Sequence, residues 1–140
     1  MRLGWVVVMV GVLMMGAGGR AVAEESTGVV VAGALDRKVF SGEVGGKGNA
    51  HGDKDEFQFH EGKFHSTACD PYGFGEGAYT TVVEGAAVTF EAETTSPTDG
   101  RMVWKGAVRG DTIEGTTTWY KKAGKTPDEM WFKGTLGPNG

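Results

Sequence analysis

The residue types best suited to chemistry gather in the segment His60–Tyr79, which holds two histidines, the single cysteine, an aspartate and two tyrosines. A histidine close to Cys69 would lower the pKa of its thiol and make a nucleophile, or would join the thiol as a metal ligand. Softer metals favour cysteine together with histidine, and most metal sites need three or four ligands. The candidate ligands for a metal ion or a haem are therefore His60, His65 and Cys69, with His51 on a neighbouring polar loop.

A structural interpretation of the same residues stays open beside this one. Cys69 would then be a small, half-buried residue at a strand end, and His60 and His65 would be solvent-facing neighbours on paired strands. If the strand continues past Ala68, His65 and Cys69 both face away from the apolar interior. No Cys-x-x-Cys or His-Glu-x-x-His motif is present, and no pair of carboxylates is expected on an inward face. The sequence indicates no cofactor and favours a binding protein over an enzyme.

The elements that must position these residues are β-strands. Residues 101–109 and 112–120 each alternate apolar and polar side chains, which is the period of a half-buried strand. Gly110-Asp111 lies between them and supplies the positive φ that a tight hairpin needs. The two runs therefore predict a β-hairpin.

A glycine follows a large apolar residue two places later at four points in the chain. The pairs are Phe40/Gly42, Trp104/Gly106, Ile113/Gly115 and Phe132/Gly134. Inward glycines of this kind mark sharply coiled strands or a close approach of two backbones. A small closed barrel needs such coiling, so the pattern favours a barrel.

Eight such runs can be followed along the chain, mostly joined by short hairpin loops. They are Arg37–Val44, Glu56–His60, Lys63–Ala68, Ala78–Val83, Ala86–Ser96, Arg101–Arg109, Thr112–Tyr120 and Glu129–Leu136. Gly45–Asp55 is expected to be a long polar loop, and Cys69–Gly77 an irregular segment. Sequential hairpins with one apolar face close into an up-and-down barrel. We therefore predict an all-β fold, a single eight-stranded antiparallel barrel, with a β-sandwich as the alternative.

The first residues have the features of a signal peptide. Arg2 precedes the apolar run Leu3–Met15, and Ala21-Val22-Ala23 fits a small-x-small cleavage site, while an uncleaved membrane anchor is the alternative. Residues 1–23 are predicted to be removed, leaving a lead-in at 24–36 and one barrel domain at 37–140. The product would be exported to the periplasm or the extracellular space, without stable membrane insertion.

The charge of the chain bears on its partners. The net charge of −4 becomes −6 when Arg2 and Arg20 are removed, because residues 1–23 contain no acidic residue. An acidic protein is a poor partner for nucleic acid, whose phosphates need clustered lysine and arginine.

Several stretches resemble a set of small exported bacterial proteins of uncharacterised function with a calycin-like (lipocalin-like) β-barrel. The resemblance rests on FQFHEGKFHSTACDPYGFGEGAY, VTFEAETTSP, VWKGAVRGDTIEGTTTWYKK and WFKGTL, within about Arg37–Leu136. It implies the barrel fold and an exported location, and it implies no activity. Ser41-Gly42-Glu43-Val44 stands where lipocalins proper have Gly-x-Trp.

The inward aromatic residues are either a filled core or the lining of a pocket. Glycines beside large rings would leave room for a small apolar or amphipathic ligand at the open mouth of the barrel. An envelope protein that binds at the same mouth is the alternative partner. The Cys69–Gly77 segment is expected to form the rim of this pocket. The predicted binding residues are Trp104, Trp119, Phe90, Phe132, Phe59, Tyr72 and Phe74. Replacement of Trp104 by alanine is predicted to abolish ligand binding.

Overall fold

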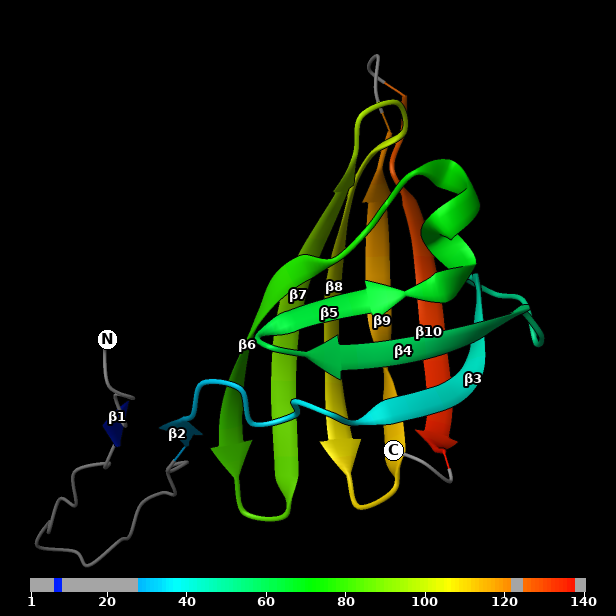
Figure 1. The fold of residues 1–140 in the computed structure, drawn as a ribbon. Helices are drawn as coiled ribbons and strands as arrows, with labels where there is room; N and C mark the ends of the chain where they lie inside the picture. The colour runs from blue at the N-terminus through cyan, green and yellow to red at the C-terminus, as the bar shows by residue number, and fades with distance from the viewer. Residues whose placement is uncertain (1–6, 9–27, 122–124, 138–140) are drawn as a thin grey trace, which may run out of the picture.

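The computed structural model describes residues 7–8, 28–121 and 125–137, and these contain a closed barrel of eight antiparallel strands (Figure 1). Its strands are β3 (Val39–Gly46), β4 (Asp53–His60), β5 (Lys63–Ser66), β6 (Gly77–Glu84), β7 (Ala87–Ser96), β8 (Gly100–Arg109), β9 (Thr112–Tyr120) and β10 (Asp128–Leu136). Each strand pairs with the next, β10 pairs with β3, and the ring is thereby closed. The predicted up-and-down barrel is confirmed, and the sandwich alternative is wrong.

Two short strands lie outside the ring. β2 (Val29–Val30) pairs with Val82 and Val83 of β6, and β1 (Val7–Val8) pairs with β2. Apart from β1, the predicted signal peptide lies outside the described residues, so its cleavage and the export of the protein stay predictions. Among the described residues, no helix is long and apolar enough to span a bilayer.

The hairpin turns follow the sequence pattern closely. Gly110 has a φ of 59° between β8 and β9, and Glu61 and Gly62 have φ values of 49° and 77° between β4 and β5. In the β4–β5 turn, positive φ at both central residues gives a twist that matches the twist of the flanking strands. The predicted polar loop is shorter than expected, because β3 extends to Gly46 and β4 begins at Asp53.

The inward glycines do allow close backbone approach. Gly42 of β3 pairs with Gly134 of β10, and Gly106 of β8 pairs with Gly115 of β9. A Cβ atom on Gly42 would lie 1.8 Å from the carbonyl oxygen of Lys133. A Cβ atom on Gly106 would lie 2.7 Å from Cζ of Phe132, so this glycine also makes room for a ring inside the barrel. Of the two meanings predicted for the large-residue/glycine pattern, close approach of two backbones is therefore the one observed.

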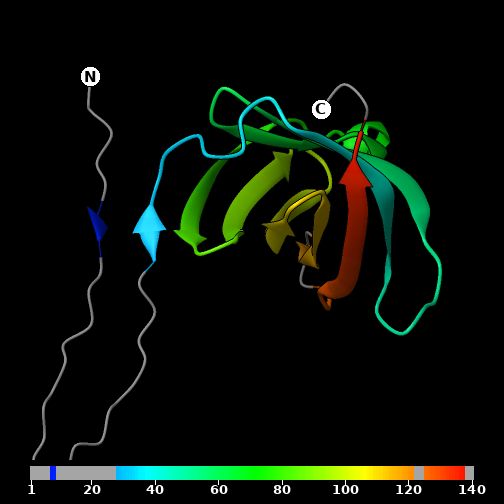
Figure 2. The same cartoon turned by 90° about the horizontal axis from the view of Figure 1, so that it is seen from below.

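Aromatic rings fill the barrel interior. The Trp104 ring centroid lies 4.9 Å from that of Phe64 and 5.3 Å from that of Phe132. Phe90 lies 5.1 Å from Phe59 in an edge-to-face contact. These side chains are almost fully buried, so ring packing and burial stabilise the fold together. The view from below shows the strands curving around the barrel, with β10 beside β3 (Figure 2).

The lead-in before β3 packs on the barrel. Leu35 is fully buried, its backbone N–H donates to the Tyr79 hydroxyl, and that hydroxyl donates to the Asp36 carboxylate over 2.7 Å. Burial raises the pKa of Tyr79. The sequence predicts only a lead-in for residues 24–36. Residues 28–36 contain the short extra strand β2 and an anchored turn.

The ring of strands is unevenly paired. β7 and β8 share ten residue pairs, whereas β5 and β6 share two, Lys63 with Ala78 and Phe64 with Gly77. β5 is short because the chain leaves the sheet at Ser66 and enters the 3₁₀ helix η1 (Thr67–Tyr72). This helix lies at the end of the barrel where β3 ends and β4 begins (Figure 1).

Candidate functional site

The helix η1 begins on a buried carboxylate. Its N-cap residue, Ser66, makes no side-chain capping bond, and Asp55 of β4 takes that role instead by accepting the Ala68 N–H over 3.0 Å. Asp55 also accepts from the Ser66 hydroxyl over 2.5 Å and from the Glu56 N–H over 2.7 Å. The carboxylate therefore ties β4 to the first turn of η1 and fixes where that helix lies.

Asp55 is 6 % exposed, and burial raises its pKa despite the hydrogen bonds, which act in the opposite direction. A carboxyl whose pKa is higher in the folded state contributes stability below its unfolded pKa of 3.8, and this contribution is lost as the pH rises through the folded pKa. Ionising Asp55 in the folded protein therefore costs more than ionising it in the unfolded chain, because its hydrogen-bond donors only partly offset the loss of hydration.

Asp55→Asn is expected to gain stability relative to the parent as the pH rises from 3 to 7. Asparagine keeps an acceptor for the Ala68 N–H but carries no charge, and the gain should be about 1.4 kcal/mol for each unit by which the pKa is raised. Urea denaturation at the two pH values measures it. Asp53→Asn, an exposed change two residues earlier on β4, is the control and should show little difference. The opposite result, a parent protein that becomes more stable relative to Asp55→Asn as the pH rises from 3 to 7, would contradict this prediction.

The other end of η1 is tied to the β7–β8 loop. Gly73 ends the helix with a φ of 88°, and the Ser96 hydroxyl donates to the Tyr72 carbonyl over 2.7 Å. The same hydroxyl accepts the Asp99 N–H, and the Asp99 carbonyl accepts the indole N–H of Trp119 over 2.7 Å. η1 and Trp119 are therefore held by one connected set of hydrogen bonds.

A pocket of about 180 Å³ lies beneath η1 at this mouth of the barrel. Its walls come from the ends of β3 and β9, the starts of β4, β8 and β10, and η1 with the segment after it. The lining residues are Val44, Gly45, Gly46, Asp53, Ala68, Cys69, Tyr72, Phe74, Met102, Trp119 and Met130. The Trp119 ring centroid lies 6.1 Å from that of Tyr72 and 6.3 Å from that of Phe74, so three aromatic rings frame one side.

Cys69 points into this pocket rather than away from the interior, so the predicted alternation past Ala68 is wrong. The strand ends at Ser66, and the turn of η1 rotates Cys69 inward. Its Sγ lies 3.4 Å from the Ser66 hydroxyl and 3.6 Å from Sδ of Met102. Burial raises the pKa of the Cys69 thiol to about 11, so at neutral pH it is protonated and a poor nucleophile.

The histidines have other partners. His65 Nε2 lies 2.6 Å from the Asp70 carboxylate, and Nδ1 lies 3.2 Å from the side-chain oxygen of Gln58. His60 is exposed beside Glu61. No hydrogen bond joins either histidine to Cys69, and the described residues contain no cluster of three His, Cys, Asp or Glu side chains able to hold a metal ion. The structure brings His65 together with Asp70 instead.

The predicted binding residues separate into two groups. Trp119, Tyr72 and Phe74 meet at the mouth pocket, as the hypothesis of a rim formed by residues 69–77 requires. The remaining four are packed in the core and do not line this pocket: Trp104, Phe90, Phe132 and Phe59. Met102 and Met130 line the pocket but were not among the predicted residues, although both follow the inward alternation of their strands.

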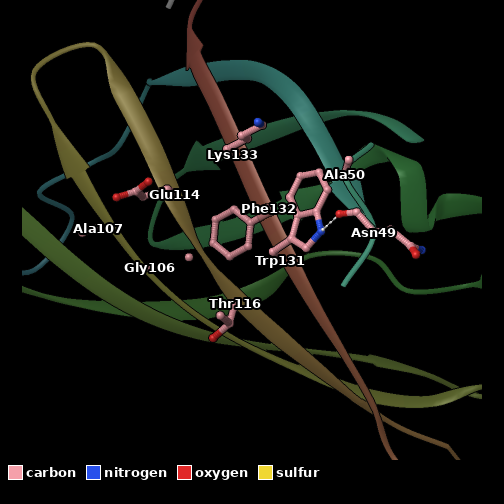
Figure 3. Close-up of a pocket in the computed structure, with 10 residues that line it drawn as sticks. Asn49, Ala50, Gly106, Ala107, Glu114, Thr116, Trp131, Phe132 and Lys133 are labelled. Carbon is pink, nitrogen blue, oxygen red and sulfur yellow. Dashed lines mark hydrogen bonds between the residues drawn. The ribbon is translucent and has the colours of Figure 1, made fainter. Parts of the chain in front are cut away.

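A second hollow lies on the outer face of β8, β9 and β10 and has a volume of about 570 Å³ (Figure 3). Trp131 borders it and donates its indole N–H to the Asn49 carbonyl over 2.9 Å. Glu114, Thr116 and Lys133 are spread across the strands rather than aimed at one point (Figure 3). Apolar pockets with a few convergent groups are the usual ligand sites, so the mouth pocket is the stronger candidate.

Comparisons of the chain with protein-family models, with curated proteins and with solved structures give no match. The eight-stranded antiparallel barrel is consistent with the calycin-like fold that the resemblance implies. Membership of an exported bacterial family stays a prediction, and the function has to be argued from the geometry of the pocket.

Proposed function

We propose that the protein is a non-catalytic, exported binding barrel that holds a small apolar or amphipathic ligand in the mouth pocket. The observation that carries this proposal is the apolar pocket beneath η1, framed by Trp119, Tyr72 and Phe74. The core below it is filled by aromatic rings, so the ligand would enter at the mouth and stop above them.

The size of the pocket limits the ligand. A dry apolar cavity of about 150 Å³ holds a benzene-sized molecule, whereas pockets for drug-sized ligands usually exceed about 300 Å³. A pocket of about 180 Å³ therefore suits a single aromatic ring or a short alkyl chain. A longer amphipathic molecule would leave its polar end at the rim, where Tyr72 is 52 % exposed and Asp53 faces solvent.

Filling the pocket tests the proposal. Toluene is expected to bind the parent protein saturably, with chemical-shift changes confined to η1, Trp119 and Met130 in NMR titrations. Ala68→Phe places a ring in the pocket and should weaken this binding by at least about tenfold, or 1.4 kcal/mol. Ala50→Phe makes the same change beside the outer hollow and is the matched control.

Two results would contradict the proposal. One is a parent protein that shows no saturable toluene binding. The other is a folded Ala68→Phe variant that binds toluene as tightly as the parent and the Ala50→Phe control.

A further inference from the structure

The sulfur atoms of the chain are concentrated at one place. The sequence contains one cysteine and six methionines, and four of the methionines lie within residues 1–23. Residues 24–140 therefore hold three sulfur atoms, those of Cys69, Met102 and Met130. All three residues line the mouth pocket, although they come from η1, β8 and β10.

Two of these sulfur atoms lie close enough together to bind the same metal ion. Sγ of Cys69 and Sδ of Met102 lie 3.6 Å apart. Sulfur ligands bind a metal ion at about 2.3 Å, so two of them on one ion lie no more than about 4.6 Å apart. Cys69 and Met102 therefore satisfy this limit without movement of the backbone. Met130 of β10 lines the same pocket and offers a third sulfur ligand.

The chemistry of the three groups selects a class of ion. Thiolate and thioether sulfur are soft ligands that select monovalent copper over hard cations such as magnesium and calcium. A thiolate together with a monovalent cation makes a neutral centre, which suits an apolar lining. A divalent ion would leave a net positive charge, and among the described lining residues Asp53 supplies the one carboxylate, at the exposed rim.

We propose that the mouth pocket binds one monovalent copper ion through Cys69 Sγ, Met102 Sδ and Met130 Sδ. The Sγ–H bond breaks as the Sγ–copper bond forms, the proton passes to solvent, and no electron is transferred. This site goes beyond the proposed binding of an apolar ligand and does not depend on it. It also differs from a Cys/His centre, because His65 is engaged by Asp70 and Gln58 outside the pocket.

Copper titration of the intact protein tests the site. Cu(I) is added anaerobically with ascorbate, and bicinchoninate serves as the competing chromogenic chelator. The parent is expected to take up one equivalent and to show a thiolate-to-copper band in the ultraviolet. Met102→Leu and Met130→Leu should each weaken binding by at least about tenfold, and Cys69→Ser should remove the band. His65→Ala is the control and should bind as the parent does.

Methionine and leucine are similar in size and both apolar, so the two leucine variants should fold and keep an apolar pocket. Toluene binding by Met102→Leu therefore reports on the proposed apolar function independently of copper. Three results would overturn the copper site: no one-to-one uptake by the parent, unchanged affinity in either leucine variant, or loss of affinity in His65→Ala. The last would point to a Cys/His centre instead.

Discussion

Replacing Gly77 with alanine is expected to lower the free energy of unfolding by more than about 4 kcal/mol, enough to unfold much of the protein. A Cβ atom on Gly77 would lie 1.7 Å from the carbonyl oxygen of Glu93 on β7 and 3.2 Å from Cα of Thr94. Both are backbone atoms of a paired strand, so neither can rotate away. Relief would require β6 and β7 to separate where β6 also pairs with β5.

Gly75→Ala is the matched control for this change. Gly75 lies two residues earlier, and apart from its own chain neighbours none of the described residues has an atom within 4 Å of the position its Cβ would take. Its replacement should change stability by no more than about 1 kcal/mol, in the stabilising direction if the backbone suits alanine. Urea denaturation followed by far-ultraviolet circular dichroism measures both variants. Equal stabilities of the two would contradict the close approach of β6 to β7.

Trp104→Ala is expected to cost about 3–5 kcal/mol of unfolding free energy, the range for emptying a large aromatic site in a core. The Trp104 ring is fully buried and contacts the rings of Phe57, Phe64 and Phe132. Its indole N–H also donates to the Thr94 hydroxyl over 3.2 Å, and that hydroxyl would lose a buried partner.

Trp131→Ala makes the same change on the outside of the barrel. Trp131 is half-buried and packs beside Gly45, so its loss should cost about 1–2 kcal/mol. Guanidinium denaturation of both variants and the parent gives the comparison. A Trp104→Ala variant that is no less stable than Trp131→Ala would show that the interior is not the packed aromatic core described above.

The fold could be predicted because local signals and global packing agree along most of the chain. In β8 and β9, apolar residues alternate with polar ones, and Gly110 supplies the turn, so period and turn chemistry give the same answer. The glycines after large residues correctly indicated close approach of neighbouring backbones, because that approach depends only on the missing Cβ.

The position of Asp55 could not be predicted with the loop boundary assumed from the sequence. Glycines and charged residues in 45–55 indicated a loop, whereas pairing with β3 draws Asp53–Asp55 into β4. Extending the alternation of Phe57 and Phe59 back by two residues places Asp55 inward, and this was the available signal. A buried carboxylate is unexpected from hydropathy alone, because the donors that stabilise it come from a later segment.

The sequence indicated the aromatic residues of the mouth pocket but not the direction of Cys69. Trp119, Tyr72 and Phe74 were expected near the mouth, and the structure brings them together there. The direction of Cys69 depends on the change from strand to 3₁₀ helix at Thr67, which the alternation of β5 does not encode. Its contact with Met102, 33 residues away, depends on the closure of the barrel.

The two residue pairs between β5 and β6 have a consequence for the motion of the barrel. Opening a sheet junction breaks its hydrogen bonds, and local opening costs least where those bonds are few. The junction of β5 with β6 is therefore the place where the closed ring opens first, while the ten pairs between β7 and β8 remain intact. Such an opening would pull on η1, because the helix follows directly on β5 while the Ser96 hydroxyl of β7 holds its other end. Motion at this junction would loosen the roof of the pocket, because η1 contributes Ala68, Cys69 and Tyr72 to its lining.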